Sequence, residues 1–326
     1  MGQKNQERSK LMTKGKAIAG DLNRFEKRRL ALMMLFAATL IWGFTFLAQS
    51  EGAKHVPPLF FNAVRFWIGG LVVLPVAVLR ATKNTGKLSF WYHVDNKALT
   101  IKGAFTDSLT IAFGVTFQQM GMATASPGKG GFLASLTIVF VAVIGLFFGK
   151  KIRLPQWLGI ATAIFGVGLM SLTSDLSIST GEIYLIISAF IYAFNTILTG
   201  YYSTRVETFK YTTFRFFFAA AICTILSLIF EEVSMDAVRT AMPTLLFTGV
   251  FSSGLAFTLQ AFAQVHVEDL TTQLMLSLES IIALLAQWIF LGTVMSGKEM
   301  LGALILFASV VFIQVYEAMA RKRLEA

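Results

Sequence analysis

The sequence has few charged residues, three histidines and a single cysteine. Lys, Arg, Asp and Glu together make up 14% of the 326 residues, whereas a soluble domain is typically about 25% charged. Cys223 stands alone, which excludes an internal disulfide and any CxxC pair. His55, His93 and His266 fall in separate predicted loops, so they form no ligand set for a metal ion. With so few charges the chain cannot present a water-compatible surface over its whole length, which argues against an ordinary soluble protein.

Common catalytic and nucleotide-binding motifs are also missing. The segment Gly128-Lys129-Gly130-Gly131 lacks the GxxxxGK spacing of a phosphate-binding loop. No GxSxG nucleophile motif occurs, and the chain has no DDxxD-type cluster of carboxylates. We therefore expect no catalytic residue, no cofactor and no metal.

Apolar residues are abundant: they form 55% of the chain and give a mean hydropathy of +0.67. They are gathered into ten runs, each close to the roughly 20 residues that a helix needs to cross a bilayer. The runs lack the alternation of strands, and a helix satisfies its own backbone hydrogen bonds in lipid. The sequence therefore predicts an all-α integral membrane protein with ten transmembrane helices. The predicted spans are residues 30–48, 58–79, 101–122, 131–149, 155–173, 182–202, 211–230, 242–264, 270–291 and 299–318.

The formal net charge is +10, but the basic residues are distributed over the tails and connections. If the basic N-tail, residues 1–29, is placed inside, nearly all Lys and Arg of the connections fall on the same side. The exceptions are Lys54, Lys129, Arg239 and Lys298. This distribution follows the positive-inside rule. We expect a multi-pass protein of the cell membrane with the N-tail and the short C-tail, residues 319–326, in the cytoplasm, and no nucleic-acid partner.

The two halves of the chain resemble each other. The segment LIWGFT at residues 40–45 matches FIYAFN at residues 190–195, and the same separation relates Arg65 to Arg215. Because each half holds five spans, an odd number, the second half starts on the opposite face of the membrane. This is an inverted repeat, which many secondary transporters use for alternating access. The predicted repeats are residues 30–174 and residues 175–318.

Several short motifs appear in an order that is familiar from one family. They are Trp42-Gly43-Phe44-Thr45, Arg65, the segment GMATAS at residues 121–126, and Leu278-Glu279-Ser280. With the five-plus-five layout, the chain resembles the EamA-type members of the drug/metabolite transporter superfamily. The resemblance implies a transporter of small metabolites or amino-acid-like solutes. Many members have proline where this chain has Ile138 and Ser280, so the resemblance does not predict helix kinks at those positions.

Charged residues inside the spans are candidates for function, because such groups are costly in hydrocarbon. Glu279 lies near the middle of the ninth span, where a carboxylate is either protonated or paired with a cation such as a substrate ammonium. Its alternative role is a neutral interhelical hydrogen bond. Arg65 and Arg215 could bind a carboxylate or phosphate through the two-pronged guanidinium. Alternatively they close a gate with a carboxylate such as Asp107, or extend to the interface; we favour this structural role for Arg215.

Uncharged polar and aromatic residues give further candidates. Trp42 and Thr45 share one helix face, as do Tyr192 and Asn195, because residues three apart are neighbours on a helix. They could stack on or hydrogen-bond a substrate, or simply pack. Six glutamines suit a zwitterionic or hydroxylated solute, or act as interhelical contacts, and we place Gln119 and Gln260 first as cavity residues. The six are Gln118, Gln119, Gln260, Gln264, Gln273 and Gln287.

These observations predict a secondary carrier for a small polar metabolite, with a central cavity between spans one, three, four, six, eight and nine. The driving force is a proton gradient or solute exchange, and we favour export. The expected partners are a small-molecule substrate and the lipid bilayer, with the protein a monomer or homodimer. The alternative is a membrane-embedded enzyme or lipid flippase that acts on a lipid-linked head group. A non-transporting scaffold is a third possibility, but it would need neither the repeat nor Glu279.

Overall fold

The computed structural model describes residues 2–85, 96–171, 179–292 and 296–325, and every regular element within these ranges is a helix. Ten spans cross the bundle, as the apolar runs predict. Three of the spans are interrupted, so the number of helical elements exceeds the number of spans. The elements are α1 (Gly2–Gly52), α2 (Pro58–Thr85), α3 (Lys97–Met122), α4 (Pro127–Ser135), α5 (Thr137–Phe147), α6 (Leu154–Ser171), α7 (Thr180–Ser203), α8 (Thr208–Phe230), α9 (Met235–Phe247), the π-helix η1 (Thr248–Ala256), α10 (Phe257–Ala263), α11 (Asp269–Leu276), α12 (Glu279–Leu291) and α13 (Gly297–Glu325).

The apolar character of the spans is not uniform. In the described part of the chain, seven helical segments are long enough and apolar enough to cross a membrane, judged by length and composition alone. In α6 and α13 the apolar stretches are shorter, Leu154–Leu169 and Met300–Tyr316. The remaining span, α3, carries Asp107, Gln118 and Gln119, all of them buried. Neighbouring helices rather than lipid surround these polar groups, which is how such a helix is tolerated.

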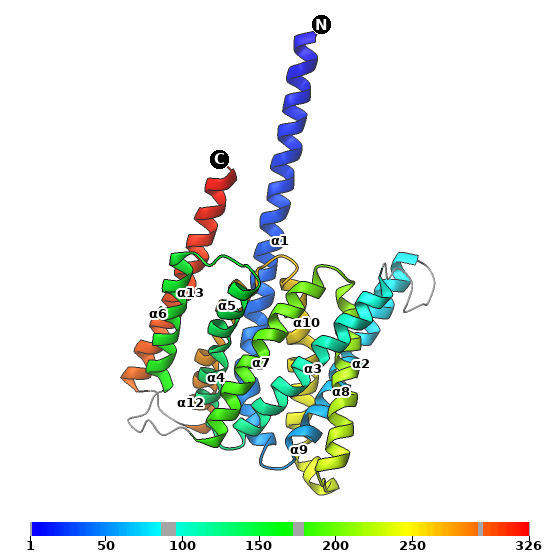
Figure 1. Ribbon diagram of the computed structural model, residues 1–326, viewed down its shortest axis with the longest axis vertical. Helices are drawn as coiled ribbons and strands as arrows, with labels where there is room; N and C mark the ends of the chain where they lie inside the picture. Colours follow the sequence, from blue (N-terminus) through cyan, green and yellow to red (C-terminus); the bar gives the residue numbers. More distant parts are fainter. Residues whose placement is uncertain (1, 86–95, 172–178, 293–295, 326) are drawn as a thin grey trace.

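Both chain termini lie at the same end of the bundle (Figure 1), as an even number of spans requires. We call this the inner end, after the predicted orientation, and the opposite end the outer end. The helix α1 begins at Gly2 and projects well beyond the bundle (Figure 1). The basic N-tail therefore continues the first transmembrane helix.

The two repeats are α1–α6 and α7–α13, and they interlock rather than sit apart. The helix α2 packs along α8, α3 packs along α7, and α1 contacts η1, α10 and α12. Phe66 and Phe216, which the repeat relates to each other, stack with ring centroids 6.1 Å apart. Contact between equivalent residues is expected where a two-fold axis passes through an interface. Since α1 starts at the inner end and α7 at the outer end, the repeat is inverted.

The fourth and ninth spans are broken near their middle although neither carries a proline there. The break between α4 and α5 falls at Leu136, and that between α11 and α12 falls at Ser277 and Leu278. Serine hydroxyls add hydrogen bonds to a carbonyl at the second break: Ser280 Oγ donates to the carbonyl of Ser277 at 2.8 Å, and Ser135 Oγ lies 3.3 Å from the same carbonyl. Polar side chains of this kind replace lost backbone bonds in a membrane helix.

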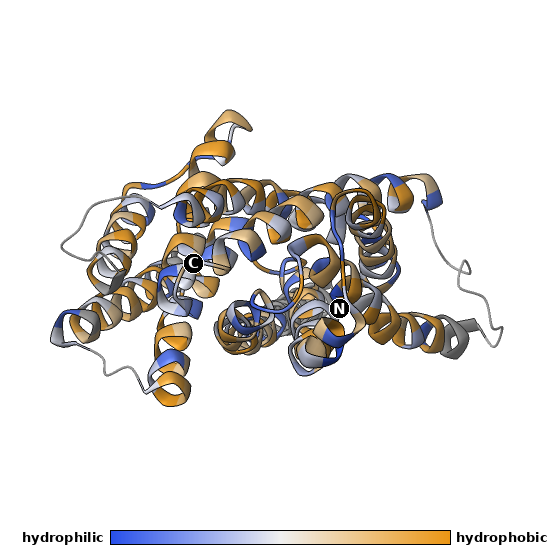
Figure 2. Cartoon of the chain, turned by 90° about the horizontal axis from the view of Figure 1, so that it is seen from below, coloured by the Kyte–Doolittle hydropathy of each residue, from blue (hydrophilic) through white to orange (hydrophobic). Residues whose placement is uncertain are grey.

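The exposed sides of the helices around the bundle are apolar. Phe147 is 86% exposed and Leu228 is 81% exposed, and most of the helical ribbon is hydrophobic when viewed along the bundle (Figure 2). In water this surface would be unstable, whereas lipid covers it without cost. The last helix of each repeat packs on the other through glycine: a Cβ on Gly166 would lie 2.7 Å from the carbonyl oxygen of Gly302. That close approach is the small-residue contact typical of membrane helices.

Candidate functional site

A small cavity lies between the two repeats, inside the ring of spans that the sequence predicts for it. Spans one, three, four, six, eight and nine line it, and span two adds Arg65. Its free volume is about 50 Å³, which is room for only a few water molecules. Seven of the eight predicted substrate-binding residues line the cavity: Trp42, Thr45, Arg65, Tyr192, Asn195, Gln260 and Glu279.

Arg65 is a buried cation without a carboxylate partner in the described part of the chain. Its side chain is 2% exposed, so it does not extend to the interface. Nε donates to Ser253 Oγ at 3.1 Å, and a terminal nitrogen, NH2, donates to Ser252 Oγ at 2.6 Å. The other terminal nitrogen, NH1, is buried and has no hydrogen-bond partner among the described residues. The positive charge of this guanidinium is therefore not neutralised by any nearby anion among the described residues.

Glu279 brings the opposite charge to the same cavity. It is the first residue of α12, directly after the break in the ninth span, and its side chain is half-buried. No hydrogen bond or ion pair joins its carboxylate to any other described residue. The interhelical hydrogen bond that was one predicted role is therefore not present in this state. The carboxylate therefore lines the cavity without a partner among the described residues.

Two amide side chains in the cavity also have unused acceptors. Asn195 Nδ2 donates to Asp107 Oδ1 at 2.6 Å, which leaves Asn195 Oδ1 buried and unpaired in the described structure. Gln260 Oε1 is likewise buried without a partner there. Buried polar atoms are normally hydrogen-bonded, and exceptions need an explanation. Two free acceptors beside a carboxylate would suit a ligand that carries N–H donors.

The aromatic candidates form part of the wall. Trp42 packs edge-on against Phe257, with ring centroids 4.7 Å apart. The hydroxyl of Tyr192 lies 3.3 Å from Gln118 Oε1, and Thr45 Oγ1 donates to the carbonyl of Ile41 at 2.9 Å. Trp42 and Tyr192 thus come from equivalent positions of the two repeats and line one cavity.

Arg215 has the carboxylate partner that Arg65 lacks. Its NH1 lies 2.9 Å from Asp107 Oδ2, and both side chains are fully buried. The same carboxylate accepts hydrogen bonds from Asn195, from Thr199 at 3.0 Å and from the hydroxyl of Tyr211. The pairing with Asp107 that the sequence suggested is therefore present, near the inner end of α8. Whether it opens and closes as a gate stays a prediction.

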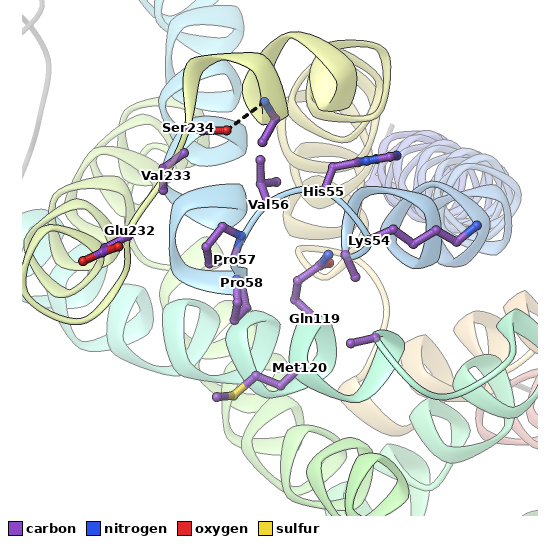
Figure 3. A pocket seen from close by; sticks show the side chains of 13 residues that line it. Lys54, His55, Val56, Pro57, Pro58, Gln119, Met120, Glu232, Val233 and Ser234 are labelled. Carbon is purple, nitrogen blue, oxygen red and sulfur yellow. Dashed lines mark hydrogen bonds between the residues drawn. The ribbon is translucent and has the colours of Figure 1, made fainter.

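On the outer side, the cavity is separated from a vestibule of about 630 Å³. Gln119 lines this vestibule rather than the cavity, together with Met120 of α3 and Lys54 and His55 of the connection after α1 (Figure 3). Its Nε2 donates to the carbonyl of Gln49 at 3.0 Å. Our expectation placed Gln119 in the cavity; a helix turns by about 100° per residue, and its neighbour Gln118 occupies that position instead.

Contacts between the ends of α1, α3, α4 and α7 lie toward the outer end of the bundle. Gln49 Nε2 donates to Gln118 Oε1 at 3.3 Å. Lys129 at the start of α4 forms an ion pair with Glu182 at the start of α7, at 2.7 Å. The Lys129–Glu182 pair joins the two repeats at the outer end, whereas the Gln49–Gln118 contact lies within the first repeat.

On the inner side lies a second vestibule, of about 1020 Å³. Lys150, which follows α5, forms an ion pair with Asp269 at the start of α11. Asp269 Oδ1 also accepts a hydrogen bond from Gln264 at 3.0 Å, and Gln264 donates to the carbonyl of Thr196 at 2.9 Å. Burial lowers the pKa of His266 in the same vestibule, and the nearby Lys27 lowers it further. Side-chain contacts between helix ends thus lie on both the outer and the inner side of the cavity.

Four polar contributors to the cavity were missed by sequence reasoning, and two of them are Gln49 of α1 and Thr137 of α5. Ser252 lines it from the π-helix η1, and Thr196 lines it from α7. A serine or threonine in an apolar run gives no signal of its own, because its hydroxyl usually bonds to a backbone carbonyl of the same helix. The π-helix was also unexpected; such segments occur frequently at functional sites. Among the described residues, no group of three or more His, Cys, Asp or Glu could hold a metal ion.

Comparisons with known proteins agree with the fold. A profile of the EamA-like transporter family matches residues 29–172 and again residues 179–315. An uncharacterized transporter of Bacillus subtilis, YoaV, is 23% identical over 89% of this chain and 98% of its own length. An uncharacterized transporter of Archaeoglobus fulgidus is 24% identical over 89% of this chain and 87% of its own length. A solved crystal structure with 17% identity has a TM-score of 0.68 and covers 91% of this chain and 99% of its own, which indicates a shared fold.

Proposed function

The chain belongs to the EamA-like transporter family, and we propose that this membrane transporter is a secondary carrier for a small zwitterionic, amino-acid-like metabolite. It moves the solute across the cytoplasmic membrane by alternating access, with both termini in the cytoplasm and export as the favoured direction. The transport role itself is supported by the family and by relatives named as transporters.

One observation supports the choice of substrate. Arg65 and Glu279 carry opposite charges, line the same cavity, and each lacks an ion-pair partner among the described residues. Unpaired charges are costly when they are removed from water. A solute with a carboxylate and an ammonium group satisfies both: the carboxylate binds the guanidinium, and the ammonium binds Glu279 with the free oxygens of Asn195 and Gln260. The cavity has to widen to admit such a solute, since its present free volume is only about 50 Å³.

The closed contacts on either side fit a carrier. The Gln49–Gln118 and Lys129–Glu182 contacts lie toward the outer end, and the Lys150–Asp269 pair lines the inner vestibule. In an inverted repeat the two halves can exchange conformations, so opening of one side with closure of the other gives two states of similar energy. Glu279 can hold either a proton or the substrate ammonium, and this alternation couples transport to a proton gradient. A strict exchanger would instead carry a solute molecule in both directions.

The alternative, an enzyme or flippase acting on a lipid-linked head group, has less support. Hydrolysis or head-group transfer by carboxylates needs two of them near the reacting atoms, whereas Glu279 is the one carboxylate among the described residues that line the cavity.

Uptake into proteoliposomes tests the proposal. We expect saturable, countertransport-capable flux of at least one amino acid, and weak competition by the matching amine and the matching carboxylic acid, since each engages only one of the two charges. Protein-free vesicles give the background. If no member of a broad amino-acid panel moves, or if the amine and acid compete as well as the zwitterion, the proposal is wrong.

A further inference from the structure

The two repeat-related arginines are held by opposite kinds of partner. Arg215 meets the carboxylate of Asp107 and is neutralised by it. Arg65 instead meets the hydroxyls of Ser252 and Ser253 from the third span of the other repeat. Hydroxyls satisfy hydrogen bonds but bring no negative charge. The electrostatic balance is therefore complete at one arginine and incomplete at the other, and the incomplete one lines the cavity.

The π-helix η1 brings two consecutive serines to one guanidinium. Ser253 receives the Nε hydrogen bond and Ser252 receives that of NH2, and both serines are fully buried. The helices α2 and η1 approach closely here: a Cβ on Gly69 would lie 2.7 Å from Ser253 Cβ, and one on Gly249 would lie 2.7 Å from Ile68 Cβ. The arginine is thus fixed on two of its three nitrogens, and NH1 is left without a partner in the described structure.

Ser252 differs from Ser253 in one respect that matters for binding: it lines the cavity, whereas Ser253 does not. A serine hydroxyl has one donor and two acceptor positions. The oxygen of Ser252 accepts from Arg65, and its own O–H makes no hydrogen bond to another described residue. The O–H of Ser252 and the NH1 group of Arg65 are therefore two free donors on the same cavity wall.

We propose that Ser252 and Arg65 together form the subsite for the anionic group of the transported solute, with Ser253 as a positioning residue. One carboxylate oxygen accepts from Arg65 NH1 and the other from the hydroxyl of Ser252. Ser253 does not touch the solute; it fixes the direction of the guanidinium through Nε. This inference rests on the proposed function and adds the residue that would select a carboxylate.

Four purified variants test the subsite: Ser252→Ala, Ser252→Thr, Ser253→Ala and the control Ser309→Ala. Ser309 is a buried serine of α13 that donates to the carbonyl of Gly159 at 2.6 Å. A hydrogen bond to a charged group corresponds to about a tenfold change in affinity or more. We expect Ser252→Ala to raise the half-saturation concentration for alanine by about tenfold and to leave competition by ethylamine unchanged. Ser252→Thr, which keeps the hydroxyl, should restore binding, and the control should match the wild type.

Ser253→Ala should raise the half-saturation concentration for alanine less than Ser252→Ala does. It should weaken competition by propionate but not by ethylamine. If Ser252→Ala weakens the binding of alanine and of ethylamine equally, the serine only supports the fold. Unchanged alanine transport by this variant would refute the subsite directly. If the wild type transports nothing, the proposed function fails separately. The subsite is then tested by thermal protection of the purified protein by propionate, which Ser252→Ala should abolish; equal protection of variant and wild type would overturn it.

Discussion

The ion pair between Asp107 and Arg215 allows a quantitative prediction about stability. Both side chains are 0% exposed and their charged atoms lie 2.9 Å apart. Arg215→Met keeps most of the side-chain volume but leaves the carboxylate of Asp107 buried without its cation. Removal of one partner of a buried pair typically costs about 3–5 kcal/mol, because the remaining charge is uncompensated. At about 2–4 °C per kcal/mol, the melting temperature should fall by roughly 10 °C.

The assay can use the single cysteine of the chain. Cys223 is 1% exposed in α8, so a fluorogenic maleimide should react with it only when the protein unfolds. The melting temperature of detergent-solubilised protein is then the midpoint of labelling against temperature. A matched control is the partly exposed pair Lys129–Glu182, whose side chains are 34% and 13% exposed; Lys129→Met should cost about 1 kcal/mol.

A double variant separates the charge from the packing. Asp107→Asn combined with Arg215→Met removes both charges and keeps an oxygen that can accept from Tyr211. Replacing both members of a buried pair is often close to neutral, so the double variant should recover most of the lost stability. Two results would contradict this reasoning. In the first, Arg215→Met costs no more stability than Lys129→Met. In the second, the double variant loses as much stability as the two single variants combined.

Three further predictions concern transport. Glu279→Gln should abolish uptake driven by a pH gradient and retain solute exchange, because glutamine cannot release a proton; unchanged gradient-driven uptake would exclude Glu279 from coupling. Arg65→Lys should raise the half-saturation concentration by about tenfold, since lysine cannot keep both serine contacts and the free donor; an effect on protein yield alone would point to a structural role. Gly200→Ala should open the inner side, because its Cβ would clash with Asp269 Oδ1. Labelling of Thr196→Cys, in a background without Cys223, by an impermeant reagent from the inner face should then increase, while Gly297→Ala, with nothing within 4 Å, should leave it unchanged.

Much of the cavity could be anticipated because polar residues stand out in apolar helices. Trp42, Tyr192, Asn195 and Glu279 were chosen for their place in the repeat or their depth in a span, and all four line the cavity. Gln118 and Gln119 could not be separated in this way. Consecutive residues on a helix face different neighbours, and the rotation of α3 within the bundle depends on how it packs against α7 and α8.

The helix breaks in spans four and nine show a second limit. Proline is the usual local cause of a kink, and its absence at Ile138 and Ser280 gave no reason to expect one. The breaks depend on contacts between spans: Gly131 lies so close to α12 that a Cβ would be 2.9 Å from Ser280 Cα, and Ser135 reaches the carbonyl of Ser277. Partners this distant in the sequence exert their effect only after the spans have packed.

The sequence by itself determined the number of helices and their inverted arrangement, since hydrophobic length and the internal repeat are properties of consecutive residues. It also identified the charges buried in the membrane. Only the tertiary structure decided what each charge does. Arg65 and Arg215 are equivalent in the repeat, yet one faces two serines and the other a carboxylate. Burial makes an unpaired charge costly, so the partner supplied by a distant helix distinguishes a structural arginine from one that still requires an anion.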